Sequence, residues 1–422
     1  MLPSPAPPDA WAAFVHVGSR IPSVDNGLLG FGLALVIALL TTPVARAFAW
    51  RIGAIDEPRE RSLHQFPTPR LGGLAIVVAV VAATLIFLPH DKKTHAILIG
   101  AAVIVLVGAG DDLLELSSDF KLVGQVFAAA IPVVGGVRVT SFTLPFVHHV
   151  GLSPPFAYGL TVLGLVALMN IVNFIDGVDG LAAGVCTITA ITFALIAFSQ
   201  HRIEPHAAGV LALITAGASL GYLRHGFHPA SIFLGDSGSN LLGYLLGAIV
   251  VQGTLKTNAL VGLAFPLVIL AVPILDSSFV IAKRIKYRRP VYQADRWHFH
   301  HRFANIGFSP RKTTLYLYGW TVTMAGLALA IRFFPYSDHH RHFHTGWVLA
   351  LIGCGLVGLA ASVYLVLVLE ILKLRRFREF QLRSDSTLAG EPEPTAADVD
   401  SRVAHELETG EFEALRAPRS ER

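Results

Sequence analysis

Charge is scarce in this chain of 422 residues, of which 15% are Asp, Glu, Lys or Arg. An ordinary soluble domain has about a quarter charged residues. Hydrophobic residues make up 53%, so much of the chain cannot face water. Cysteine is scarcer still: Cys186 and Cys354 both lie in apolar runs, which argues against a disulfide framework or a zinc knuckle. A basic stretch ahead of the first apolar run is also missing, so we read that run as a retained membrane helix.

Apolar runs of about 20 residues, long enough to cross the hydrocarbon core of a bilayer, recur from residue 26 to residue 373. They predict an all-α polytopic membrane protein with about eleven spans: 26–48, 71–88, 96–110, 122–136, 157–172, 181–198, 207–223, 240–253, 259–281, 314–334 and 347–372. The third and eighth spans are short, which leaves re-entrant or partly unwound segments open there. Alternating residues in 136–146 predict a short external β-hairpin.

Lysine and arginine are concentrated in the loops at one side of this predicted topology. The loop after the first span has four arginines, and the loop after the ninth has nine basic residues between Lys283 and Lys312. By the positive-inside rule, the odd spans end in the cytoplasm, the N-terminus with residues 1–25 lies outside and the C-terminus lies inside. The tail, 384–422, has ten acidic and four basic residues, a net charge of −6, and is expected to be disordered.

Six aspartates fall where odd spans meet the cytoplasm: Asp111, Asp112, Asp176, Asp179, Asp236 and Asp276. Carboxylates at the edge of a membrane are costly and usually mark a functional site. Mg²⁺ takes oxygen ligands, preferring one or two carboxylates plus substrate phosphates. Glycines surround three of the acidic runs and would allow a phosphate to approach the backbone closely. The pattern predicts a site for a divalent cation and a polyanion such as a pyrophosphate.

Two basic loops at the same side add candidate substrate ligands. The loop after the ninth span contains His298, His300, His301 and Arg302. No cysteine accompanies them, so a phosphate or sugar clamp is a better interpretation than zinc. In the first loop, Arg61, His64, Thr68 and Arg70 are candidates to face an anionic substrate. Ordinary anchoring to the membrane surface is the alternative for these four.

Five linked runs resemble a known family: H-Q-F-P-T-P-R-L-G-G, G-A-G-D-D-L-L-E-L with K-L-V-G-Q, N-I-V-N-F-I-D-G-V-D-G-L-A-A-G, F-L-G-D-S-G-S-N-L-L-G and D-R-W-H-F-H-H-R-F. They resemble the polyprenyl-phosphate N-acetylhexosamine-1-phosphate transferases, the superfamily of MraY, WecA and TagO in glycosyltransferase family 4. The resemblance covers residues 56–312 in the right order. It implies a catalytic transmembrane domain, 26–373, with its active site in the cytoplasmic loops.

The resemblance also implies roles for individual residues. Asp111 and Asp112 would be the paired aspartates near the metal and the lipid phosphate, and Asp236 the metal-binding aspartate, helped by Asp112. The cofactor would be Mg²⁺, with Mn²⁺ as an alternative.

Further roles concern the substrate. Asn173, Asp176 and Asp179 would form the acidic site for the nucleotide-sugar and catalysis, and Lys121 would bind substrate. The histidine motif, with Arg302, would contact substrate phosphate or sugar.

The histidine motif favours the WecA and TagO type, because Phe299 interrupts the histidine run that is typical of MraY. The resemblance therefore implies transfer of N-acetylglucosamine-1-phosphate from UDP-GlcNAc to undecaprenyl or decaprenyl phosphate, at the inner membrane of a bacterium. The phospho-MurNAc-pentapeptide transferases and, in a different class, membrane prenyltransferases remain as alternatives. A transporter would carry its charges nearer the bilayer midplane. Membrane lipid is an expected partner, nucleic acid is not, and a homodimer is left open.

Overall fold

The computed structural model describes residues 22–57, 66–143, 149–200, 203–253, 309–335, 344–364 and 395–409, and the four isolated positions 274, 379, 382 and 386. The chain divides into two compact units. The first comprises residues up to Asn173 and those from Cys186 to Leu263. The second comprises Phe174–Val185 and the residues from Ala264 onward.

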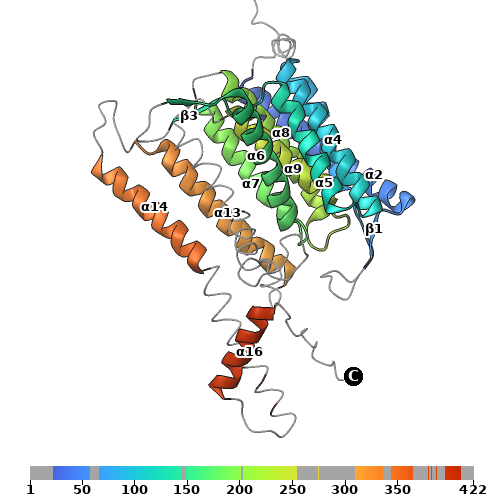
Figure 1. Ribbon diagram of the computed structural model, residues 1–422, viewed down its shortest axis with the longest axis vertical. Helices are drawn as coiled ribbons and strands as arrows, with labels where there is room; N and C mark the ends of the chain where they lie inside the picture. The colour runs from blue at the N-terminus through green and yellow to red at the C-terminus, as the bar shows by residue number, and fades with distance from the viewer. Residues whose placement is uncertain are drawn as a thin grey trace, which may run out of the picture. The chain divides into compact units, whose positions relative to one another are not determined.

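Helices make up the first unit almost entirely (Figure 1). They are α2 (Val24–Ile52), α3 (Gly72–Phe87), α4 (Lys92–Leu114), α5 (Ser118–Val134), α6 (Pro154–Ile175), α7 (Leu181–Phe198), α8 (Ile203–Gly226) and α9 (Gly235–Gly253). The loop that joins α6 to α7 belongs to the second unit. Helix α4 packs against α5 and α9, and α8 packs against α2 and α9. Helix α3 lies against α2, α8 and α9.

The predicted class, an all-α polytopic membrane protein, is confirmed. Seven described helices are long and apolar enough to cross a bilayer, namely α2, α4, α6, α7, α8, and the later helices α13 and α14. A described helix overlaps each of ten predicted spans, and the ninth, 259–281, lies outside the described residues except for the single position Ile274. The direction in which the termini face stays a prediction.

The third and eighth predicted spans are too short, because each helix continues through polar residues. Helix α4 has 23 residues and includes Asp111 and Asp112, and α9 has 19 and begins five residues before the predicted start. Hydropathy placed the ends at the acids, but hydrogen bonding extends the helices through them. Neither helix contains an unwound segment, and the re-entrant alternative stays a prediction.

Small residues form the packed face of α2, as expected where lipid tails are as apolar as the side chains. Its buried positions are Gly27, Gly30, Ala34, Ala38, Thr42, Ala45 and Ala49. Large side chains such as Leu40 and Val44 are instead two-thirds exposed. Close backbone approach to α8, rather than a core of large residues, therefore holds this helix pair together.

A short two-stranded sheet ties the first loop to the start of α9. Strands β1 (Ile55–Asp56) and β2 (Thr68–Pro69) pair antiparallel. The Phe233 amide donates to the Pro69 carbonyl at 2.8 Å, and the Gly72 and Gly73 amides donate to the carbonyls of Phe233 and Leu234. The segments preceding α3 and α9 are thus joined by backbone hydrogen bonds.

The hairpin predicted in 136–146 is present, although slightly later in the chain. Strands β3 (Ser141–Thr143) and β4 (His149–Gly151) pair antiparallel between α5 and α6. Its predicted external location stays a prediction.

The second unit contains α13 (Pro310–Phe333), α14 (Thr345–Val363) and α16 (Ala396–Thr409). Helix α13 packs on α14, and the Trp320 indole donates to the Ser362 hydroxyl at 3.0 Å. Helix α16 differs from the disorder expected for the tail. Thr395 and Asp398 form a reciprocal capping box at its start, which satisfies amides that would otherwise lack partners.

Two glycines two residues apart in α4 test the packing on α9. A Cβ on Gly108 would lie 2.5 Å from the Cα of Ser237, whereas a Cβ on Gly110 meets nothing closer than 3.7 Å. Gly to Ala normally stabilises a helix interior by about 1 kcal/mol. We expect Gly108→Ala to lower the thermal midpoint of the detergent-purified protein and Gly110→Ala to leave it equal or higher. Equal midpoints would contradict the close contact.

Candidate active site

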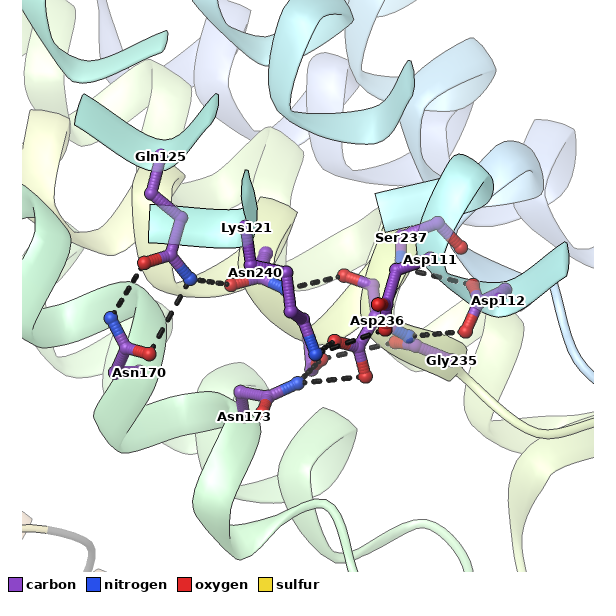
Figure 2. A network of polar contacts seen from close by, with 11 residues as sticks. Asp111, Asp112, Lys121, Gln125, Asn170, Asn173, Gly235, Asp236, Ser237 and Asn240 are labelled. Atoms are coloured by element: carbon purple, nitrogen blue, oxygen red, sulfur yellow. Dashed lines mark hydrogen bonds and ion pairs between the residues drawn. The ribbon is translucent and has the colours of Figure 1, made fainter. Parts of the chain in front are cut away.

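Four helix ends meet at one end of the first unit and bring polar side chains together (Figure 2). The last turn of α4 supplies Asp111 and Asp112, the first turn of α5 supplies Lys121, the last turn of α6 supplies Asn173, and the first turn of α9 supplies Asp236. The prediction that acids from separate spans share one side is confirmed for Asp111, Asp112 and Asp236. We call Asp111, Asp112, Lys121, Asn173 and Asp236 the acid cluster.

Glycines allow the helix ends to approach this closely. A Cβ on Gly108 of α4 would lie 2.7 Å from the carbonyl carbon of Asp236. Gly235 has a φ of +71°, and a Cβ there would lie 2.5 Å from the Asp112 Oδ2. Because side chains at these positions would separate α4 from α9, the sequence keeps them bare.

Asp112 caps the N-terminus of α9 with both carboxylate oxygens. Oδ1 accepts a hydrogen bond from the Asp236 amide at 2.8 Å, and Oδ2 accepts one from the Ser237 amide at 3.1 Å. The first amides of a helix lack partners within the helix, and its dipole favours a negative charge there. At α9 this negative charge is a side chain of the same protein.

Lys121 lies between the other two carboxylates. Its ammonium is 2.9 Å from Asp111 Oδ2 and also forms an ion pair with Asp236 Oδ2. The three side chains are only partly exposed, so this pairing is less screened than at an open surface. One lysine therefore holds Asp111 and Asp236 at a common point.

Asn173 on α6 orients the Asp236 carboxylate, and Ser239 on α9 in turn holds the Asn173 amide. The Asn173 Nδ2 donates to Asp236 Oδ1 at 3.1 Å and to the Ser239 hydroxyl at 2.9 Å. The Ser239 hydroxyl donates to the Gly235 carbonyl at 3.0 Å. Asn173 was predicted as a substrate ligand, and the structure brings it to the predicted metal ligand.

The charges of the acid cluster do not balance. Three carboxylates face one ammonium, so two negative charges remain when all four groups are ionised. Among the described residues, no group of three or more His, Cys, Asp or Glu is arranged to hold a metal. This donor set still fits Mg²⁺, which binds through one or two carboxylates and takes its other ligands from water and phosphates. Asp111 and Asp236 are the suitable pair. Each Asp112 oxygen keeps a second lone pair beside its hydrogen bond to a backbone amide. The predicted role of Asp112 as an additional metal ligand stays a prediction.

Thr68 and Arg70 lie in and beside β2. The Thr68 side chain is buried and donates to the Phe66 carbonyl at 3.1 Å. The Arg70 guanidinium forms an ion pair with Asp56 of β1, and its amide donates to the Ala54 carbonyl at 2.9 Å. These contacts shape the first loop, and the predicted contact of both side chains with substrate stays a prediction.

The other predicted site residues lie in the second unit or outside the described residues. Asp176 and Asp179 lie in the loop between α6 and α7, which belongs to the second unit. In that unit the Tyr318 hydroxyl donates to the Gly180 carbonyl at 2.6 Å. Arg61, His64, Asp276, His298, His300, His301 and Arg302 lie outside the described residues.

Sequence reasoning missed the neutral residues behind the acid cluster. Asn240 donates to the Asp236 carbonyl at 2.8 Å, and Gln125 donates to Asn240. Both lie inside helices, four residues after a charged residue of the cluster. That spacing, an amide one turn beyond a charge, is the signal that identifies them.

The fold and the site together define a multi-pass membrane protein with a carboxylate-rich centre suited to a divalent cation and a phosphorylated substrate. The model of glycosyl transferase family 4 matches residues 94–254, which contain the whole acid cluster. A probable undecaprenyl-phosphate N-acetylglucosaminyl 1-phosphate transferase of Bacillus subtilis is 36% identical over 72% of this chain and 87% of its own length. A decaprenyl-phosphate N-acetylglucosaminephosphotransferase of Mycobacterium tuberculosis is 35% identical over 76% of this chain and 87% of its own.

A phospho-N-acetylmuramoyl-pentapeptide-transferase of Desulforudis audaxviator is less similar, at 31% identity over 72% of this chain and 96% of its own length. The chain belongs to glycosyl transferase family 4. The resemblance drawn from its five motifs is thereby confirmed, and the pentapeptide-transferase alternative is not favoured.

Replacing the Asp112 carboxylate tests its role as the cap of α9. Asp112→Asn would turn one acceptor into an amide that faces a backbone N–H, and it would remove the negative charge at the dipole. We expect a loss of about 1–3 kcal/mol in the free energy of unfolding. Asp111→Asn should lower the free energy of unfolding by less, because Lys121 keeps its ion pair with Asp236. Thermal midpoints of the two purified variants would decide, and an equal loss would contradict the capping role.

Proposed function

We propose that the protein transfers N-acetylglucosamine-1-phosphate from UDP-GlcNAc to a polyprenyl phosphate, producing polyprenyl-diphosphate-GlcNAc and UMP. The identity of 35–36% with two transferases named for this sugar, over more than 70% of the chain, carries the proposal. The acid cluster supports it, because its residues belong to the motifs on which the resemblance rests.

A membrane fold suits such a pair of substrates. The prenyl tail of the acceptor dissolves in the bilayer, whereas the nucleotide-sugar is soluble in water. A site at the ends of membrane helices lets the lipid phosphate and the nucleotide meet. Each Asp in the cluster lies within one turn of a helix end, so the reacting groups need not enter the hydrocarbon core.

The proposed chemistry is a direct displacement. A phosphate oxygen of the lipid attacks the sugar-proximal phosphorus of UDP-GlcNAc, a new P–O bond forms, and the bridging bond to UMP breaks with its electrons. The lipid phosphate is already largely ionised at neutral pH, since its second pKa is about 6. Asp111 would therefore orient this phosphate or accept a remaining proton. Trapping the sugar-phosphate as an acyl phosphate on Asp111 or Asp112 would instead show a two-step route.

Charge stabilisation and alignment should supply most of the acceleration. Lys121 would offer its ammonium to phosphate oxygens while it holds Asp111 and Asp236. Asn173 would keep Asp236 oriented. Asp236 and Asp111 would hold Mg²⁺, with Asp112 beside them, and a bound Mg²⁺ would neutralise the pyrophosphate.

The remaining parts of the proposal rest on the sequence. Asp176, Asp179 and the histidine motif would contact the nucleotide-sugar, and the positive-inside pattern would place the active site in the cytoplasm of a bacterium, at its inner membrane.

The donor can be tested directly. Purified protein in detergent with undecaprenyl phosphate is incubated with radiolabelled UDP-GlcNAc or UDP-MurNAc-pentapeptide. We expect lipid-extractable label and stoichiometric UMP with the first donor only. Label from the pentapeptide donor would support the alternative transferase. In a separate incubation with a prenyl diphosphate and an aromatic acceptor, release of pyrophosphate would indicate a prenyltransferase.

Metal dependence gives a second test. Chelation with EDTA should abolish transfer, and added Mg²⁺ should restore it. Asp236→Asn should be inactive at any Mg²⁺ concentration while still inserting into membranes. Asp119→Asn, an exposed carboxylate two residues before Lys121, serves as the control with unchanged activity. Near-normal transfer by Asp236→Asn would remove the metal assignment.

A further inference from the structure

Three amide side chains form a buried hydrogen-bonded layer directly behind the acid cluster (Figure 2). They are Gln125 on α5, Asn170 on α6 and Asn240 on α9, and Gln125 and Asn240 are 3% and 2% exposed. Each is one helical turn from a cluster residue on the same helix: Gln125 follows Lys121 by four positions, Asn170 precedes Asn173 by three, and Asn240 follows Asp236 by four. We call these three residues the amide layer.

The bonds of the amide layer run continuously across three helices. The Gln125 Nε2 donates to Asn240 Oδ1 at 2.8 Å, and the Asn170 Nδ2 donates to Gln125 Oε1 at 2.8 Å. At the ends, Asn240 Nδ2 donates to the Asp236 carbonyl and Asn170 Nδ2 to the Val166 carbonyl, both at 2.8 Å.

Both ends of the chain of amides are backbone carbonyls, which only accept hydrogen bonds. The Asp236 carbonyl requires the nitrogen of Asn240, which turns the Asn240 oxygen toward Gln125. Gln125 must then present its nitrogen to Asn240 and its oxygen to Asn170. The Val166 carbonyl requires the same orientation of Asn170 from the other end. All three amides therefore have one self-consistent orientation.

Such a layer does more than hold helices together. Hydrophobic burial does not distinguish helix rotations when the surroundings are lipid, whereas directional hydrogen bonds do. Rotating α5, α6 or α9 would break the layer, and the same rotation would move Lys121, Asn173 or Asp236. Each amide of the layer lies one helical turn from Lys121, Asn173 or Asp236, so the layer controls the position of all three residues.

We propose that Gln125, Asn170 and Asn240 are positioning residues, which fix the rotation of α5, α6 and α9 so that Lys121, Asn173 and Asp236 face one point. The role in transfer rests on the proposed function. The layer aligns groups that act on the reacting phosphate, so its loss lowers kcat and leaves the binding of UDP-GlcNAc nearly unchanged.

Kinetics of Gln125→Met and Gln125→Glu test this role. Met keeps the length of the side chain without hydrogen bonds, and Glu keeps its shape but places an oxygen against the Asn240 oxygen. We expect kcat for UMP release to fall about 10- to 100-fold and KM for UDP-GlcNAc to change less than about threefold.

The matched control is Tyr244→Phe. Tyr244 is fully buried on α9, and its hydroxyl donates to the Ile97 carbonyl of α4 at 2.9 Å, outside the amide layer. Its loss should leave kcat within about twofold of the wild type. A similar kcat for Gln125→Met and Tyr244→Phe, or a Gln125 effect confined to KM, would overturn the positioning role. Asn170→Leu, at the half-buried end of the layer, makes the same test if the Gln125 variants do not fold.

A second measurement does not depend on activity. In thermal midpoints, Gln125→Met and Asn240→Leu together should cost less than the sum of the single changes, because either one already breaks the layer. Gln125→Met and Tyr244→Phe should be additive. Additivity of the first pair would overturn the layer itself. A wild type that releases no UMP from UDP-GlcNAc would overturn the proposed function, and the midpoints would still decide whether the layer exists.

Discussion

The site depends on one interaction, the carboxylate of Asp112 against the first amides of α9. It joins the end of one membrane helix to the beginning of another, and it places Asp236 in the turn that it caps. The backbones can come this close because Gly108 and Gly235 have no side chains to keep them apart. Without this contact, the first amides of α9 would lose the carboxylate that caps them, and the turn that carries Asp236 would lose its link to α4.

The surrounding medium explains why this interaction is so influential. A charge near a low-dielectric region is costly unless hydrogen bonds or counter-charges compensate it. Asp112 accepts hydrogen bonds from two backbone amides, and Asp111 and Asp236 both form ion pairs with Lys121. The remaining negative charge suits the divalent cation of the proposed function. The same groups thus stabilise the helix ends and would supply carboxylate ligands to that cation.

Placement at the helix ends also suits the two substrates of the proposed function. The lipid-facing sides of the helices expose large apolar residues such as Leu106 and Leu163, while small residues pack inside. A prenyl chain is compatible with the first surface, and a nucleotide with the polar end. The backbone link from β2 to the start of α9 connects the first loop to that end, so Arg70 and Asp236 belong to one framework even though their side chains have different partners.

Sequence alone determined the class, the helices and the family. Apolar length is a local property, so the ranges of ten spans could be read from it, and the acids marked the helix ends because charges are excluded from the bilayer core. Motif resemblance then supplied roles for Asp111, Lys121 and Asp236 that periodicity does not contain.

Only the tertiary structure decided which groups pair. Asp112 and the Asp236 amide are 124 positions apart, and no local pattern specifies that hydrogen bond. The same holds for Gln125 with Asn240, since an amide in an apolar helix has many possible partners until helix rotation is known. Hydropathy also ended α4 too early and began α9 too late, because it counts an aspartate as a polar break and cannot register that Asp112 caps another helix. Local composition decides where a helix can cross the membrane, and the packing of bare glycine backbones decides which polar groups meet.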